Sequence, residues 1–506
     1  MESSKGIKNI IAGLLANFLT FAVGLIIPRL VLVNLGSEAN GLLNSVGSIL
    51  GYLSLLEAGV GTASLNALYK PCANKDRDAI NSIMAATDYF YNRTGKIYLF
   101  LVVLLSIGYT LLVQTELPQV DVFLVVLLCG LSGVGSYFFQ GKFKLYLAAE
   151  GKSYISTNIG TFIQIATSIT KAILLYVGFG VVEIQFAAFA LNVIQIIFFL
   201  YYMRKHYAWI DLKVKPNLDA INQKNAVLIH QIAALIFNNT DVLLLTIFTS
   251  LKEVSVYSMY AMIYGMVKWL AVVLYESYTF VLGQSYNTDR ARFLKMFDAY
   301  EICTMMITFS LYCICRALIN PFLSLYTSGV NDIQYVDKYL PWLFAAFYVL
   351  HNGRTSSATL INIAQHFERT KWRAVVEAII NVTISVICIN IFGIYGVLLG
   401  TVAALFYRSN DMIIYAARIL DRSCLITYKR WIINLVVFAF CSAIINLFTI
   451  PAENYLQLFC SACIVSLFVI SVFILANIIM EKENMKYLAS VAKNIIRGSL
   501  QKLKRA

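Results

Sequence analysis

The sequence contains little of what a soluble enzyme needs. Only 13% of its 506 residues are charged, whereas about 25% are charged in a typical soluble domain, and it has just seven prolines and four histidines. It contains no Walker A, HExxH or GxSxG segment. An ATP-driven pump or a soluble-type hydrolase is therefore unsupported, and no long polar stretch leaves room for an extramembrane catalytic domain.

Residues that commonly bind metals are scattered along the chain. The four histidines fall in different segments, and most of the ten cysteines lie inside apolar runs. Cys460 and Cys463 form a CxxC pair, but no second pair or histidine cluster accompanies them. We therefore expect no metal site and no cofactor, and we interpret the cysteines as small side chains facing lipid or the protein core.

Hydrophobic residues make up 59% of the chain and occur in runs of about 20 residues, the length that crosses a bilayer. These runs predict an all-α integral membrane protein with about fourteen transmembrane helices. The spans lie near 9–33, 41–66, 94–113, 121–147, 154–178, 181–202, 225–248, 254–283, 294–316, 338–362, 374–391, 394–417, 431–449 and 456–480. The first run is too long for a signal peptide and is interpreted as an uncleaved span.

The positive charges alternate between the two sides of this arrangement. If the N-terminus is cytoplasmic, 31 of the 40 Lys and Arg residues lie on cytoplasmic connections or tails. The opposite side holds Lys252 and Lys338, with Arg316 at the end of a helix. Because cytoplasmic loops are enriched in Lys and Arg, this pattern predicts an even number of spans with both termini cytoplasmic.

A weak internal repeat divides the chain. Residues 34–42 and 249–257 are both short turns between long helices, and Glu38 matches Glu253 at an offset of 215 residues. This repeat predicts two six-helix lobes in the manner of duplicated transporters. The expected parts are an N-terminal lobe (1–203), a cytoplasmic linker (204–224), a C-terminal lobe (225–417), two further spans (418–480) and a cytoplasmic amphipathic tail (481–506).

Eight charged residues fall inside the expected spans, where an isolated charge is costly and usually marks a cavity or a partner. The candidate cavity cations are Arg29, Lys171, Lys268, Arg354 and Arg408, and the candidate ion-coupling carboxylates are Glu57, Asp241 and Glu276. A cationic cavity suits a large anion such as a diphosphate-linked lipid, because Arg and Lys bind phosphate oxygens strongly.

Four of the candidates also have a structural interpretation. Arg408 can mark a helix end, Lys171 can extend toward the headgroups, and Arg29 can pair with Asp241. Asp241 ends a polar turn that begins at Asn238, which suits Na⁺ or proton coupling or simple polar packing between helices. The Gly47–Gly51 pair has the spacing of a close helix contact.

The segment 28–41 (PRLVLVNLGSEANG), continued by 52–61 (YLSLLEAGVG), resembles the opening of bacterial polysaccharide flippases. These flippases form the Wzx-like branch of the multidrug/oligosaccharidyl-lipid/polysaccharide (MOP) exporter superfamily. Residues 239–241 and 255–258 look like the start of that family's second lobe. Glu57 stands where the family often has Asp before Leu-Gly, and Ala58-Gly59 departs from that pattern.

The resemblance implies two six-helix lobes in a V with two peripheral helices, and alternating access. It also implies transfer of undecaprenyl-diphosphate-linked oligosaccharide to the outer leaflet for capsule, O-antigen or exopolysaccharide synthesis, driven by Na⁺ or H⁺. The resemblance further implies a multi-pass protein of the bacterial inner (plasma) membrane. Membrane lipids and polysaccharide-assembly proteins are the expected partners, and no nucleic acid is expected. A MATE-type multidrug antiporter and a lipid II flippase remain alternatives. A membrane glycosyltransferase or polymerase fits the sequence less well, because such an enzyme is expected to carry a large catalytic loop. The longest connections here, 68–93 and 204–224, are too short for one.

Overall fold

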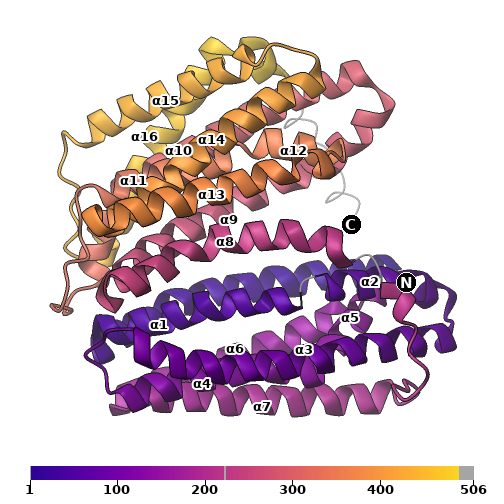
Figure 1. Ribbon diagram of the computed structural model, residues 1–506. Coiled ribbons are helices and arrows are strands. Elements are labelled where there is room, and N and C mark those ends of the chain that lie inside the picture. The colour runs from indigo at the N-terminus through magenta and orange to yellow at the C-terminus, as the bar shows by residue number, and fades with distance from the viewer. Residues whose placement is uncertain (1, 58, 222–223, 489, 491–506) are drawn as a thin grey trace, which may run out of the picture. The chain divides into compact units, whose positions relative to one another are not determined.

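The computed structural model describes residues 2–57, 59–221, 224–488 and 490, and its regular secondary structure in these ranges is entirely helical (Figure 1). The expected all-α class is confirmed. The helices are α1 (Glu2–Leu53), η1 (Ser54–Leu56), α2 (Val60–Asn74), α3 (Arg77–Leu112), α4 (Gln119–Gly135), η2 (Ser136–Gln140), α5 (Gly141–Ala149), α6 (Ser153–Val177), α7 (Val181–His206), η3 (Leu218–Ile221), α8 (Lys224–Phe248), α9 (Leu251–Thr288), α10 (Arg290–Tyr326), α11 (Leu340–Gly353), α12 (Thr355–Ile363), α13 (Phe367–Phe392), α14 (Ile394–Leu420), α15 (Leu425–Ile445) and α16 (Tyr455–Met480).

Ten helical segments within the described ranges are long and apolar enough to cross a membrane. Each of the fourteen predicted spans also coincides with helical structure. The first two spans lie in α1, η1 and α2, while the seventh, eighth and tenth correspond to α8, α9 and the α11–α12 pair. The amphipathic tail predicted for 481–506 lies mostly outside the described residues.

Two span boundaries differ from the sequence-based expectation. α10 continues to Tyr326, so Arg316 lies ten residues inside a helix and the prediction of a helix end there is wrong. The tenth span is broken at Arg354, where α11 ends and α12 begins. Hydrophobic runs predict where a helix crosses lipid, and they carry no information on helical turns beyond the bilayer or on breaks within it.

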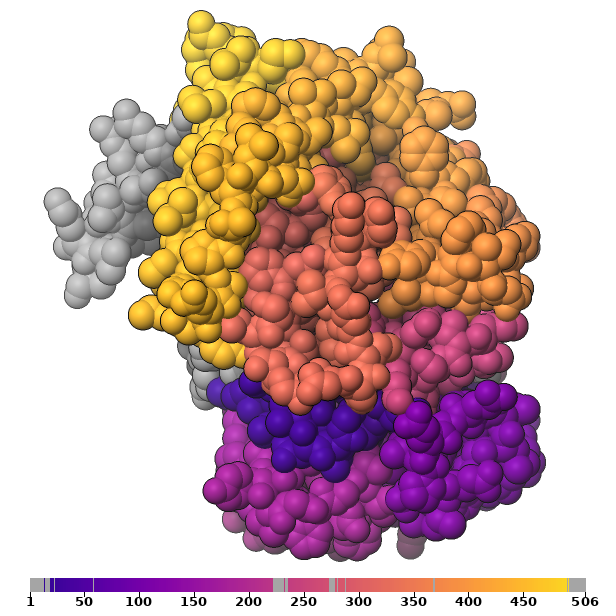
Figure 2. Space-filling model, turned by 90° about the vertical axis from the view of Figure 1, so that its left-hand side faces the viewer, coloured from indigo at the N-terminus to yellow at the C-terminus, as the bar shows by residue number. Residues whose placement is uncertain are grey.

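The chain divides into two compact units. Unit 1 comprises residues 1–258 and 329–333, and unit 2 comprises residues 259–328 and 334–506. Long helices lie side by side in each unit (Figure 1). Within unit 2, the residues of α16, yellow in Figure 2, lie beside the salmon residues near the end of α10 and the start of α11.

The turn expected between the first two spans occurs at Gly36, whose φ of 82° is readily adopted only by glycine. The backbone nitrogen and the hydroxyl of the next residue, Ser37, each donate a 2.7 Å hydrogen bond to the carboxylate of Asp332. This paired contact fixes the bend and ties the 329–333 segment to unit 1.

Within unit 1, α8 and the beginning of α9 pack against α1 through a row of polar contacts. Asn40 donates to Ser255 at 2.7 Å, and the two residues are separated by 215 positions, the offset of the internal repeat. The Ser45 and Thr246 hydroxyls are 2.7 Å apart, and Tyr52 lies 2.9 Å from Thr240. Hydrogen bonds between small polar side chains are a common means of joining helices where both sides face lipid.

Glycine allows a close helix contact at a position other than those expected. A Cβ on Gly41 would lie 1.8 Å from the carbonyl oxygen of Leu251, so the two backbones touch there. Gly51 faces Asn239 at ordinary contact distance, whereas Gly47 has open space around it. The expectation of close packing at Gly47 is wrong, because spacing along a helix does not reveal which face meets a neighbour.

In unit 2, buried ion pairs join α15 and α16 to α10. Glu301 of α10 is 1% exposed and accepts hydrogen bonds from Arg422, Arg430 and Thr427. Asp298, one turn earlier, binds the same two arginines. Arg430 also lies 3.5 Å from Glu481, the residue that follows α16. These contacts neutralise two arginines, of which Arg430 is 3% exposed.

Replacing Glu301 with Ala is expected to destabilise the protein by about 3 kcal/mol, because it removes the most buried carboxylate from Arg422 and Arg430. The measurement is thermal unfolding of the purified protein in detergent. Lys486→Ala is the control: it removes an exposed pair with Glu483 and should leave the melting temperature unchanged. Equal melting temperatures for Glu301→Ala and the unchanged protein would contradict this account.

Candidate functional site

Unit 1 contains a polar cavity of about 510 Å³ among four of its membrane helices. It is lined by Thr20, Val23, Gly24, Ile27 and Pro28 of α1, Ser132 of α4, Gly160, Ile163, Gln164, Thr167, Ser168 and Lys171 of α6, and Ala188, Asn192 and Gln195 of α7. Seven of the fifteen lining residues carry a hydroxyl or amide side chain, and the rest of the wall is mostly apolar. Because polar groups are costly in hydrocarbon, their concentration in one cavity marks a candidate binding site.

Hydrogen bonds within the protein use part of the polar capacity of the cavity. Ser132, Ser168 and Gln195 donate to Leu128, Gln164 and Gln140, respectively. Thr20 donates to Gln164 at 3.2 Å, and Lys171 donates to the side-chain oxygen of Gln185 at 3.1 Å. Lys171 is the one charged side chain among the described lining residues. An ammonium has three donors, so the bond to Gln185 does not saturate it. The cavity can therefore supply one positive charge together with several amide and hydroxyl groups.

Unit 2 places Arg354 and Arg408 in a buried charge network. Arg354 Nη1 lies 2.8 Å from Glu377 Oε1 of α13, and Arg408 Nε lies 3.4 Å from the other oxygen of Glu377. Arg408 also donates to Asp411 at 2.6 Å, and Asp411 binds Arg373 as well. Two of the five candidate cations are therefore matched by carboxylates within their own unit.

The sequence-based list omitted Glu377 and Asp411. Glu377 stands near the edge of the predicted span 374–391 and was not counted as an intramembrane charge, although α13 begins seven residues before that span. The available signal in the sequence was that Glu377 falls within the predicted span 374–391 itself. Lys268 of α9 makes a different contact, a 3.0 Å hydrogen bond with Nε2 of His351, one turn before Arg354.

No family model and no curated protein matches the chain. Comparison with solved structures does find matches. The lipid II flippase MurJ in an inward closed conformation aligns over 92% of this chain and 98% of its own, with 14% identity and a TM-score of 0.68. An inward-facing multidrug resistance MATE transporter of the MOP superfamily aligns over 79% and 94%, with 14% identity and a TM-score of 0.65. The MATE transporter DinF-BH in complex with R6G aligns over 81% and 94%, with 13% identity and a TM-score of 0.57.

The chain has the fold of MATE transporters and of MurJ. It is thus a multi-pass membrane protein whose fold is shared with transporters and a flippase. The MurJ match extends over more of the chain than the MATE matches do. Within this fold, the polar cavity and the charge network occupy separate units.

Two of the candidate coupling carboxylates accept hydrogen bonds from tyrosines. The Tyr91 hydroxyl donates to Glu57, and the Tyr257 hydroxyl donates to Asp241 at 2.8 Å. Asp241 is 3% exposed. A phenol donor satisfies an oxygen of a buried carboxylate, which would otherwise be costly to place in a membrane. The coupling role of either residue stays a prediction.

Two further candidates are less defined. Arg29 is half-buried on α1, on the N-terminal side of the turn at Gly36, and its suggested pairing with Asp241 stays a prediction. The side chain of Glu276 lies outside the described residues. Among the described residues, no group of three or more His, Cys, Asp or Glu side chains is arranged to bind a metal ion.

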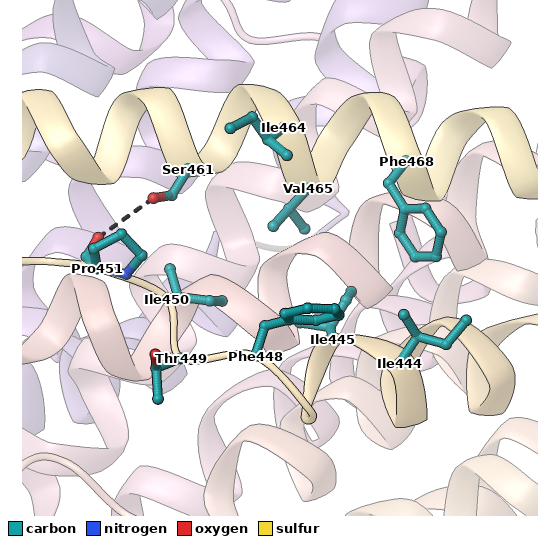
Figure 3. A pocket seen from close by; sticks show the side chains of 10 residues that line it. All are labelled: Ile444, Ile445, Phe448, Thr449, Ile450, Pro451, Ser461, Ile464, Val465 and Phe468. Carbon is teal, nitrogen blue, oxygen red and sulfur yellow. Dashed lines mark hydrogen bonds between the residues drawn. The ribbon is translucent and has the colours of Figure 1, made fainter.

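An apolar groove of about 580 Å³ lies between α15 and α16 (Figure 3). Its wall is formed by Ile444, Ile445, Phe448, Thr449, Ile450, Pro451, Ser461, Ile464, Val465 and Phe468. The one hydrogen bond drawn there joins the Ser461 hydroxyl to the carbonyl of Pro451 at 3.3 Å. None of its described lining residues is charged, and the groove therefore offers mainly hydrophobic contact.

Replacing Glu377 with Leu should destabilise the protein by about 3–5 kcal/mol, because Arg354 then loses its carboxylate in a buried position. Replacing Arg354 and Glu377 together with Leu should recover most of that loss, since no unpaired charge remains at that pair. Thermal unfolding of the single and double variants measures both effects. Additive losses in the double variant would contradict the pairing.

Proposed function

We propose that this protein is a Wzx-like flippase that moves undecaprenyl-diphosphate-linked oligosaccharide units from the cytoplasmic to the outer leaflet by ion-coupled alternating access. The observation that carries the proposal is the cavity around Lys171. Amide and hydroxyl side chains such as Asn192 and Gln195 match the hydroxyls of a glycan, and one ammonium matches a phosphate oxygen.

The breadth of the MurJ match supports a lipid-linked cargo. MurJ is by its description a lipid II flippase, and it covers 92% of this chain, against 79% for the inward-facing MATE transporter. A multidrug antiporter is the second candidate, favoured by the MATE matches. A positive side chain in the cavity disfavours cationic cargo, because like charges repel in a site of low dielectric constant.

The test is flipping of a fluorescent lipid-linked oligosaccharide in liposomes that contain the purified full-length protein. Lys171→Met removes the charge while keeping a long side chain, and we expect roughly tenfold slower flipping, the effect of losing one charge-assisted hydrogen bond. Lys213→Met, which changes an exposed lysine on the 204–224 connection, is the matched control and should flip at the original rate. Unchanged flipping by Lys171→Met, or export of a cationic dye with no flipping at all, would refute the proposal.

Ion coupling is tested at Asp241. An imposed H⁺ or Na⁺ gradient should accelerate flipping by the unchanged protein, and Asp241→Asn should abolish that acceleration, because the amide can neither bind a proton nor supply a charge to Na⁺. Tyr257→Phe is the matched control: it removes the hydrogen bond at Asp241 and keeps the carboxylate. Full gradient dependence in Asp241→Asn would exclude Asp241 and make Glu57 or Glu276 the next candidate.

A further inference from the structure

We propose that a groove between α11 and α15 binds an anionic phospholipid of the bilayer, with the phosphate on Arg316 and one acyl chain along the groove. This site lies wholly in unit 2. It is separate from the cavity around Lys171 and does not depend on the proposed flippase activity.

The first observation is the setting of Arg316 on α10. Its side chain is 6% exposed, and Nη2 donates to Asn446 at 3.1 Å. Its guanidinium carbon lies 4.2 Å from the ring centroid of Trp342. Nε is buried without a hydrogen-bond partner, and no described carboxylate lies within ion-pair distance of Arg316. The other buried arginines of unit 2, at positions 354, 408 and 430, each contact a carboxylate.

An arginine buried in a membrane protein without a counter-ion is costly. The nearby tryptophan ring and amide oxygen reduce that cost, but neither carries a full negative charge. A phosphodiester would complete the neutralisation, because a guanidinium presents several donors in a plane that matches phosphate oxygens. The charge at this position therefore points to an anionic ligand from outside the described chain.

The second observation is an apolar groove of about 440 Å³ beside Arg316. Trp342 and Asn446, the two residues that contact Arg316, both line it. Small side chains leave the hollow between the helices, including Ala346 on α11 and Ala439 and Ala443 on α15. Trp342 is 41% exposed and Leu435, which also lines the groove, is 47% exposed, so the groove opens on the surface of the protein.

The groove has the position and length of an acyl chain. α15 has 21 residues, which corresponds to roughly 31 Å and so to the full hydrocarbon thickness. Asn446 caps this helix and therefore stands at the membrane interface, where tryptophans such as Trp342 are also enriched. Leu435 lies eleven residues earlier, roughly 16 Å deeper and near the bilayer midplane. The phosphate and one chain of a lipid in a single leaflet would cover this distance.

The charge of Arg316 and the exposure of the groove between α11 and α15 indicate which lipid binds there. One guanidinium matches the single negative charge of a phosphodiester such as that of phosphatidylglycerol, and it leaves the additional charge of a polyprenyl diphosphate unmatched. The lipid-exposed opening gives direct access from the bilayer. The groove between α15 and α16 provides an internal contrast, because no charged side chain lines it and it cannot select lipids by headgroup charge (Figure 3).

The experiment measures lipid binding to the purified full-length protein by native mass spectrometry, with phosphatidylglycerol and phosphatidylcholine of the same chain length. Arg316→Gln should weaken phosphatidylglycerol binding about tenfold and abolish the preference over phosphatidylcholine, as expected for the loss of one charge-assisted phosphate contact. Ala439→Leu fills the groove while leaving Arg316 in place, and it should weaken the binding of both lipids. Lys338→Gln removes an exposed positive charge nearby in unit 2 and should change neither.

Three results would overturn the proposal. Unchanged phosphatidylglycerol binding in both Arg316→Gln and Ala439→Leu would remove the site. A lower melting temperature of Arg316→Gln with its lipid preference intact would assign Arg316 a structural role through its contacts with Asn446 and Trp342. Displacement of phosphatidylglycerol by a short polyprenyl phosphate at equal concentration would identify an isoprenoid as the occupant instead. If the unchanged protein binds phosphatidylglycerol but does not flip the lipid-linked oligosaccharide, the result counts against the proposed function and leaves this lipid site standing.

Discussion

Hydrocarbon cannot hydrogen-bond or solvate charge, and the rest of this structure depends on that constraint. The backbone N–H and C=O groups form hydrogen bonds with one another within helices, which are the regular structure throughout the described residues. Side chains that would be hydrated in a soluble protein find partners on neighbouring helices instead. Glu301 binds two arginines, and Glu377 binds two others. Helix packing in unit 2 is thus tied to the pairing of charge.

The two units meet this constraint by different means. In unit 1, α1 is joined to α8 and α9 by neutral contacts such as Ser45–Thr246 and Asn40–Ser255, and the cavity is lined mostly by hydroxyls, amides and small or apolar side chains. In unit 2, the helices are joined by carboxylate–arginine networks. A neutral polar wall keeps some donors and acceptors for a ligand. In a matched ion pair, the charge and most of the hydrogen-bonding groups of each side chain are already bound to the partner. This difference favours Lys171 over Arg354 and Arg408 as the residue that meets a phosphate.

Arg316 departs from the pattern of unit 2. It lies beside aromatic and amide groups and has no carboxylate within reach among the described residues, at the level where α15 ends. The same level holds the mouths of two apolar grooves, one on each side of α15. The last two helices, α15 and α16, are therefore held to α10 by the ion pairs at Glu301, and they present lipid-accessible grooves near Asn446.

The sequence by itself determined the helical class, the positions of the fourteen helical segments and the turn near Gly36, because each depends on local hydropathy or on one residue's backbone freedom. It also identified Lys171, Arg354 and Asp241 as unusual, since charge in an apolar run is visible without a fold. Only the tertiary structure decided which of these charges are neutralised. Glu377 pairs with Arg354 across 23 positions, and Glu301 pairs with Arg430 across 129. Such contacts depend on which helix faces meet, and a hydrophobic run that is apolar all round does not specify its neighbours.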